Sequence, residues 1–94
     1  MISVTRQSGD DPLSFDVVVG DERGTTRHQV TMASDLYQRL TQGKCAPEIC
    51  IEAAFRFLLD REPKESILRR FDAGVIAQYF PEFERDLPRY LSAR

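Results

Sequence analysis

The sequence predicts a small α+β domain in which an N-terminal β-hairpin packs on a small helical layer around one central, buried helix. Two observations carry this prediction. Residues 13–32 contain two segments that alternate apolar and polar side chains, as strands with one buried face do. Residues 47–62, PEICIEAAFRFLLDRE, are apolar over most of a helical wheel. A helix of that composition has to be covered on two or three sides, so we expect the other elements to be its covers.

The hairpin is predicted from Leu13–Val19 and Arg27–Met32. Five apolar side chains would share its buried face: Phe15, Val17, Val19, Val30 and Met32. The residues between the two strands, GDERGTT at 20–26, contain two glycines and are typical of a turn. Ile2–Arg6 has the composition of one more short strand. Because a lone hairpin is only marginally stable in water, we expect it to pack on the central helix.

Both ends of the central helix are marked in the sequence. Pro47 suits the first helical position, where its missing N–H is not needed. Glu62 precedes Pro63, and a proline disfavours the helical conformation in the residue before it. Four polar residues fall within one arc of roughly 120° and predict a solvated face: Glu48, Glu52, Arg56 and Asp60. Phe57 lies opposite the Glu52–Arg56 stripe and is expected to be buried.

The remaining segments predict short helices. Ser34–Thr41 forms one, and residues 64–70, KESILRR, form one or two turns of another. Asp72 is a suitable N-cap for a helix over Ala73–Tyr79. Residues 81–87 predict a last helix that Pro88 interrupts, with a frayed segment after it.

Length and composition indicate the general class of protein. Ninety-four residues predict a single domain, 1–94. Fractions of 41% hydrophobic and 30% charged residues are ordinary for a soluble globular domain. No apolar run approaches the ~20 residues that span a bilayer, and MISVTRQSGDD lacks the apolar region of a secretory signal. We therefore expect a cytoplasmic protein with no membrane partner, in which Cys45 and Cys50 are reduced.

The chemically reactive residues form no recognisable catalytic or metal-binding pattern. His28 is the single histidine, and nothing around it indicates the nucleophile or orienting carboxylate that a catalytic dyad needs. Cys45 and Cys50 have no second pair at the spacing of zinc ligands. We therefore predict a non-enzymatic protein with no catalytic residue, no metal and no cofactor. An enzyme is the third choice, and would need a site assembled from residues distant in sequence.

Aromatic residues are concentrated near the C-terminus. They are Tyr79, Phe80, Phe83 and Tyr90. They would serve either as core packing for short helices or as a partner-binding surface, since aromatic side chains are enriched at protein interfaces. The sequence leaves both interpretations open. The second favours protein–protein interaction with an unidentified partner, by a chain that is a monomer or a weak homodimer.

One part of the chain resembles a family of short bacterial proteins of unknown function. The residues that carry the resemblance are REPKESIL at Arg61–Leu68, then Phe71 and Asp72, then VIAQYFPEFE at Val75–Glu84. The similar stretch, from Pro47 through Phe83, covers a little under half of the chain. The resemblance implies a stand-alone soluble bacterial protein, and it implies no activity, cofactor or catalytic residue.

A second resemblance is to ribbon–helix–helix DNA-binding proteins. RHQVTM, SDLYQRLT and the segment from Pro47 to Arg61 give a strand and two helices in the order of that family. The resemblance implies a two-chain ribbon in the major groove, with Arg27, Gln29 and Thr31 facing the bases. The net charge of −2, spread without a basic block, argues against it, because phosphate neutralisation dominates affinity for DNA. DNA binding is therefore the alternative to protein interaction.

Overall fold

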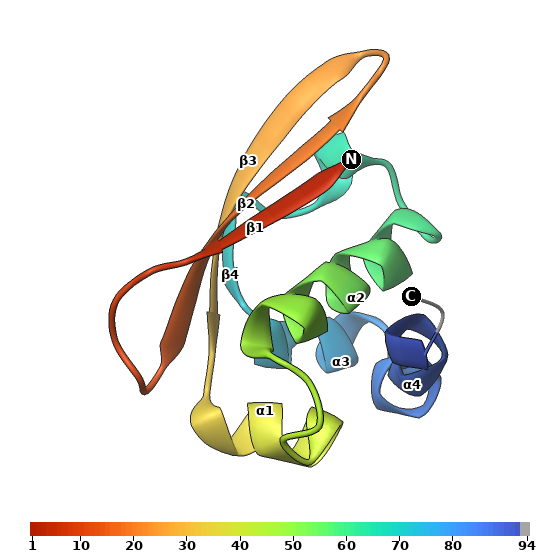
Figure 1. Ribbon diagram of the computed structural model, residues 1–94. Coiled ribbons are helices and arrows are strands. Elements are labelled where there is room, and N and C mark those ends of the chain that lie inside the picture. The colour runs from red at the N-terminus through yellow and green to blue at the C-terminus, as the bar shows by residue number, and fades with distance from the viewer. Residues whose placement is uncertain (93–94) are drawn as a thin grey trace.

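Four strands form one sheet, and the helices lie together on one of its faces in the computed structural model of the protein, which describes residues 1–92 (Figure 1). The strands are β1 (Ile2–Arg6), β2 (Leu13–Asp21), β3 (Gly24–Met32) and β4 (Arg70–Asp72), in the order β1-β2-β3-β4. The first three pair antiparallel, and β4 adds to β3 in parallel. The predicted α+β class, with an N-terminal hairpin against a helical layer, is confirmed.

The hairpin of β2 and β3 is longer than the sequence predicted, and its turn is shorter. Only Glu22 and Arg23 separate the two strands. The turn is closed by Asp21, whose carboxylate accepts a hydrogen bond of 2.7 Å from the Arg23 amide, and by Gly24, whose φ of 123° suits glycine. The predicted buried face is confirmed, because Phe15, Val17, Val19, Val30 and Met32 are all nearly inaccessible to solvent.

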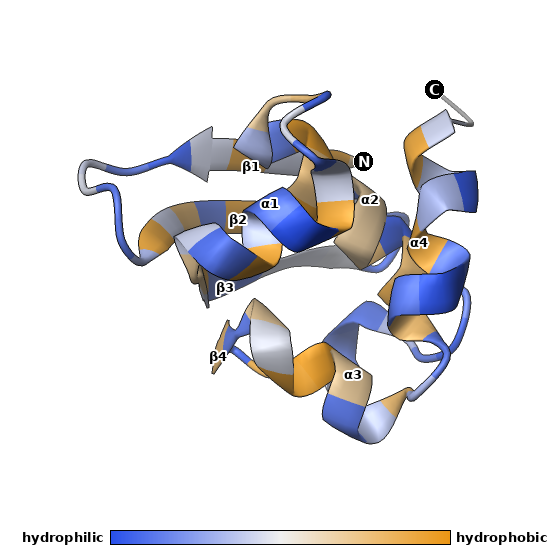
Figure 2. Ribbon diagram, turned by 90° about the horizontal axis from the view of Figure 1, so that it is seen from below, coloured by the Kyte–Doolittle hydropathy of each residue, from blue (hydrophilic) through white to orange (hydrophobic). Residues whose placement is uncertain are grey.

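The helical layer contains four α-helices and two single 3-10 turns in the part of the chain that is described. The helices are α1 (Ser34–Thr41), α2 (Pro47–Leu59), α3 (Ile76–Tyr79) and α4 (Phe83–Ser92), and the 3-10 turns are η1 (Lys64–Ser66) and η2 (Ala73–Val75). In Figure 2, α1 and α4 each show hydrophilic and hydrophobic sides, as helices with one buried face do. No helix among residues 1–92 is long and apolar enough to cross a membrane.

Helix α2 is the central element, as predicted. It contacts β1 on the sheet side and both α1 and α4 on the others. Its apolar residues are buried on several sides, Phe57 completely. The helix ends at Leu59 rather than at Arg61 or Glu62. Residues 60–62 form a turn in which the Arg61 and Glu62 amides both donate to the Leu58 carbonyl, so the influence of Pro63 reaches further back than its immediate neighbour.

The predicted solvated face of α2 is partly wrong. Arg56 is half-buried, and its guanidinium donates a 2.7 Å hydrogen bond to the backbone carbonyl of Tyr90 in α4. Asp60 is exposed, yet its carboxylate accepts a 2.6 Å hydrogen bond from the Tyr90 hydroxyl. Helix α4 therefore covers part of the face that carries the charges. Charged residues at that spacing predict a solvated face, but here the backbone and the hydroxyl of Tyr90 in a second helix bind two of them.

Two predictions for the C-terminal third are also wrong. The segment 64–70 forms only the turn η1 and then extends, because its backbone joins β3: the Gln29 amide donates to the Arg69 carbonyl at 2.8 Å. Helix α4 begins at Phe83 and runs through Pro88 to Ser92. The contacts of Tyr90 with α2 hold the helix together beyond the proline, which by itself costs helical stability. The cap at Asp72 is confirmed, since its carboxylate accepts from the Gly74 amide at 2.9 Å.

Candidate functional site

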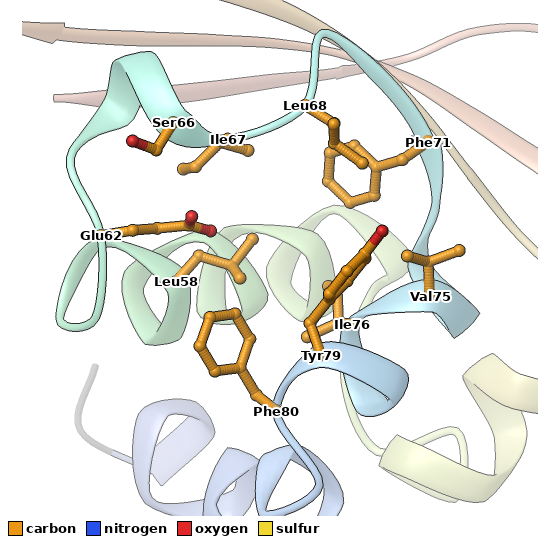
Figure 3. Close-up of a pocket in the computed structure, with 10 residues that line it drawn as sticks. All are labelled: Leu58, Glu62, Ser66, Ile67, Leu68, Phe71, Val75, Ile76, Tyr79 and Phe80. Atoms are coloured by element: carbon orange, nitrogen blue, oxygen red, sulfur yellow. The ribbon is translucent and has the colours of Figure 1, made fainter.

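An apolar groove of about 240 Å³ opens between the end of α2, the segment that follows η1, and the η2–α3 turn (Figure 3). We call it the α3 groove. Its lining residues come from three parts of the chain: Leu58 and Glu62 from the end of α2, Ser66, Ile67 and Leu68 from the extended segment, and Phe71, Val75, Ile76, Tyr79 and Phe80 from β4 to α3. Eight of these ten side chains are aliphatic or aromatic, so the groove offers mainly apolar contact.

The floor and the rim of the α3 groove differ in exposure. The floor is part of the core, since Leu58, Ile67 and Ile76 are buried. The rim is formed by Leu68, which is 51% exposed, and by Tyr79, which is 68% exposed. Apart from Met1 at the chain terminus, these are the most exposed large apolar side chains among residues 1–92. Because both exposed side chains line the same groove, they extend its apolar surface to the solvent and make it a candidate binding surface.

His28 fixes the extended segment that carries Leu68. Its ring is buried in the sheet, 5.3 Å from the ring of Phe55 between centroids. Its Nδ1 lies 2.8 Å from the Leu68 carbonyl oxygen, and its Nε2 lies 2.8 Å from the Thr26 hydroxyl. A carbonyl only accepts, so Nδ1 carries the proton and Nε2 accepts from Thr26 in the neutral ring. These two contacts give the single histidine a structural role, because they attach the segment at Leu68 to β3.

Lys64 fixes the other end of the same segment. Its ammonium group is almost completely buried and lies 2.8 Å from the Asp21 carboxylate and 2.6 Å from that of Glu65. The hydrogen bond to Asp21 is the main cause that raises the pKa of Lys64, and the bond to Glu65 adds to it. Turn η1 is thus attached to the hairpin turn. With both ends fixed, the wall of the groove that contains Leu68 is a preformed surface.

Glu62 provides the one carboxylate among the lining residues. Its side chain reaches into the groove from the end of α2, toward Leu58 and Ile67 (Figure 3). It makes no ion pair and no side-chain hydrogen bond with any residue of the described part of the chain. Burial among apolar neighbours raises its pKa above the ordinary glutamate value. The α3 groove is therefore apolar with a single acidic point.

The predicted aromatic surface is divided by the structure. Tyr79 stands on the rim of the α3 groove, and Phe80 lines it while packing edge-on against Phe57, at 5.9 Å between ring centroids. Phe83 is buried against Phe57 at 5.0 Å, and Tyr90 is half-buried on the same ring at 5.8 Å. Packing at these distances and edge-to-face angles is typical of aromatic cores. Two of the four predicted residues therefore belong to the groove and two to the α2–α4 contact.

That contact is completed by a set of polar side chains around Arg61. The guanidinium of Arg61 lies over the Phe57 ring, 3.6 Å from its centroid. It pairs with Glu82 at 3.0 Å and with Asp86 at 3.4 Å. Asp86 is buried, and the hydrogen bond from Arg85 is the main cause that lowers its pKa. Arg61 thus neutralises both Glu82 and Asp86, and these pairs join α4 to the turn after α2.

The residues predicted to face DNA lie on the outer surface of the sheet. Arg27 is exposed, and Gln29 and Thr31 are half-buried. The Thr31 hydroxyl donates to the Asp72 carboxylate at 2.7 Å. Strand β3 pairs with β2 along its whole length and with β4 at residues 29–31. A ribbon shared between two chains needs a free strand edge; both edges of β3 are paired within the chain at residues 29–31, whereas Arg27 is paired on the β2 edge alone.

The cysteines and acidic residues offer no further site. Cys50 is buried, and burial raises the pKa of its thiol to about 12, which makes it unreactive at neutral pH. Within residues 1–92, no three His, Cys, Asp or Glu side chains are grouped so that they could hold a metal ion.

Sequence reasoning singled out Tyr79 and Phe80 but not Glu62, Leu68 or Phe71. Glu62, Leu68 and Phe71 lie in segments for which the sequence predicts helices or no element at all. Their closeness to one another in the fold therefore cannot be predicted from the sequence. Comparisons of the chain with protein-family models, with curated proteins and with solved structures gave no significant match.

Proposed function

We propose that this chain is a non-enzymatic protein-interaction module whose docking surface is the α3 groove. The observation that carries the proposal is the exposure of Leu68 and Tyr79 on the rim of a preformed apolar groove. A fully buried leucine side chain stabilises a contact by about 1.5–3 kcal/mol. A partner that covered this rim would gain part of that energy from each of the two side chains.

The size of the groove limits the kind of partner. A volume of about 240 Å³ accommodates one or two side chains. Stable globular interfaces bury about 800 Å² on each side, which is more than this feature offers by itself. A short segment of a partner protein, bound weakly and reversibly, therefore fits better than a broad domain surface. The rigid wall at Leu68 favours such binding because little ordering is needed.

The cellular location and the oligomeric state that we propose are those expected from the sequence. The module would act in the cytoplasm, as a monomer or a weak homodimer. Cys45 and Cys50 form no disulfide within residues 1–92, as is usual for proteins of a reducing compartment. The alternative is a DNA-binding regulator, and the pairing of β3 with β2 along its length and with β4 at residues 29–31 favours the interaction module over it.

Site-specific photocrosslinking in the native cells tests the proposal. A photoreactive phenylalanine analogue replaces Tyr79 on the rim in one variant and Arg27 on the outer sheet face in another. We expect discrete adducts from position 79 alone, identified by mass spectrometry, and their loss in a Leu68→Glu background. Gln78→Glu is the matched control, since Gln78 is exposed on α3 but does not line the groove.

The proposal is overturned by any of three results. The first is the same adducts from positions 79 and 27, which would indicate unspecific proximity. The second is adducts at position 79 that survive Leu68→Glu as well as they survive Gln78→Glu. Absence of any adduct at position 79 in cells where the chain is abundant would also reject the groove as the docking surface.

A further inference from the structure

Glu62 differs from the ion-paired carboxylates on either side of α2 because, among residues 1–92, no cation pairs with it. Arg61 is shared by Glu82 and Asp86, Arg39 binds Glu84 through two hydrogen bonds, and Lys64 is shared by Asp21 and Glu65. Each of these carboxylates has a lowered pKa. Glu62, between Leu58 and Ile67, has a raised pKa with burial as its cause.

The cations nearest to Glu62 in sequence are already committed elsewhere. Arg61, its neighbour, points to α4 and contacts Glu82 and Asp86. Lys64, two residues further on, is buried against Asp21 and Glu65. Neither can turn to Glu62 without breaking an ion pair that joins two elements of the fold. Within residues 1–92 neither neighbouring cation neutralises Glu62, so a binding partner can supply the counter-charge.

We infer that the α3 groove selects a partner segment that places an apolar side chain on its floor and a lysine or arginine beside it, against Glu62. This inference rests on the proposed function and specifies the chemistry of the partner. The apolar walls and the lone carboxylate are complementary to that combination of side chains. A carboxylate that is partly removed from water gains more from a cation than an exposed one does, because the local dielectric is lower.

The aromatic side chains of the groove add to the same preference. Phe71, Tyr79 and Phe80 line one side, with Tyr79 lying between the other two rings in the view of Figure 3. The face of an aromatic ring attracts a cation, and the methylene stem of a lysine or arginine packs well on apolar surface. An acidic residue at the same place in the partner would face Glu62 without a counter-charge, so the groove should discriminate strongly between the two signs.

The experiment is an NMR titration of the full, 15N-labelled chain at pH 7.5 with blocked hexapeptides. The probes are Ac-Gly-Ser-Leu-Lys-Ser-Gly-NH2 and three relatives in which Lys becomes Gln, Lys becomes Glu, or Leu becomes Ser. The peptides are added to millimolar concentration, since single-side-chain contacts are weak. Glu62→Gln is the test variant. Glu22→Gln is the matched control, because it removes the same charge from a residue that is exposed in the hairpin turn.

We expect the Leu-Lys peptide to shift the amide signals of the groove residues, with a Kd roughly three- to tenfold below that of the Leu-Gln peptide. The Leu-Glu and Ser-Lys peptides should bind more weakly still. The preference for Lys over Gln should disappear in Glu62→Gln and persist in Glu22→Gln. The spectrum of each variant reports directly whether it is folded.

The other outcomes separate the two proposals. If the Leu-Lys, Leu-Gln and Leu-Glu peptides bind the groove equally, the inference about charge is overturned and the docking function stands. If the Ser-Lys peptide binds as well as Leu-Lys, the attraction is unspecific and the inference fails. If no peptide shifts the groove signals at millimolar concentration, the inference and the assignment of the groove as a docking surface both fail.

Discussion

Aromatic and charged residues lie on both sides of helix α2, but their interactions within the chain differ between the two sides. On the α4 side, aromatic rings pack around Phe57, and Arg61 neutralises Glu82 and Asp86. On the α3 side, Tyr79 is exposed and Glu62 has no partner within residues 1–92. Aromatic and charged residues stabilise the fold where each finds its complement inside the chain. Where the complement is missing, they are available for binding, and the difference predicts which substitutions affect stability.

The largest effect is expected from Phe57→Ala on the α4 side. The side chain is fully buried and contacts three other aromatic rings. Truncation removes its transfer free energy and leaves a cavity, which costs about 3–5 kcal/mol of unfolding free energy. Denaturant titration measures it. A loss below about 1 kcal/mol would mean that the α2–α4 contact is not a packed core, and the contrast between the two sides would collapse.

The next effect is expected from Arg61→Met, which keeps most of the side-chain length and removes the charge. Asp86 and Glu82 would each lose a charge-assisted contact, and such contacts contribute about 1.5–3 kcal/mol. We expect a loss near the lower end, since Arg85 and Arg89 still lie beside Asp86. Arg27→Met is the control, because Arg27 is exposed on the outer face of the sheet and the change should alter stability by less than about 0.5 kcal/mol. Equal losses in both variants would contradict the role given to Arg61.

A smaller effect of opposite sign is expected from Glu62→Gln on the α3 side. Because the folded state raises the pKa of Glu62 above the ordinary 4.5, the folded protein holds that proton more readily than the unfolded chain. Ionisation therefore destabilises the fold as pH rises through the interval between these two pKa values. The side chain of the Glu62→Gln variant cannot ionise, so its unfolding free energy does not fall for this reason as pH rises.

The measurement for Glu62→Gln is its difference from the wild type in unfolding free energy as a function of pH. Relative to the wild type, the variant should gain stability on passing from below pH 4.5 to neutral pH. The gain should remain within about 0.5 kcal/mol, as for most surface substitutions. Other carboxylates titrate alike in both proteins and cancel in the difference. A variant that lost stability with rising pH relative to wild type would show that Glu62 has an unseen cationic partner.

The same contrast explains what the sequence could predict. Period-two alternation in 13–32 and the apolar run at 47–62 are signals that long elements impose locally, so the hairpin, α2 and the burial of Phe57 were predictable. Strand β4 has three residues, too few to alternate, and it exists because its backbone pairs with β3. Helix α4 continues past Pro88 because Tyr90 binds α2. Neither the pairing of β4 with β3 nor the contact of Tyr90 with α2 can be predicted from the residues that lie beside β4 or Pro88 in the sequence.

The candidate site was predictable only in part for the same reason. Tyr79 and Phe80 were visible as aromatic residues in a C-terminal cluster, but composition alone could not separate them from Phe83 and Tyr90. Phe80 packs on Phe57 as Phe83 and Tyr90 do, and only the folded structure shows that it also lines the groove. Glu62 looked like an ordinary residue at the end of a helix. Its position among Leu58, Ile67 and Phe80 follows from the path of the segment that His28 and Lys64 fix.

The smallest effect on stability is expected from Tyr79→Ser, the variant that most directly separates folding from binding. Tyr79 is 68% exposed and makes none of the ring contacts that hold Phe83 and Tyr90. Its truncation should change the unfolding free energy by less than about 0.5 kcal/mol. The same change should weaken binding of the Leu-Lys peptide several-fold, because one wall of the groove is lost.

Tyr90→Ser is the counterpart on the α4 side, where we expect the reverse: a clear loss of stability and unchanged peptide binding in the fraction that remains folded. If Tyr79→Ser instead destabilised the protein by more than about 1 kcal/mol, Tyr79 would be a packing residue. The distinction between the α4 side and the α3 side of α2 would then no longer hold.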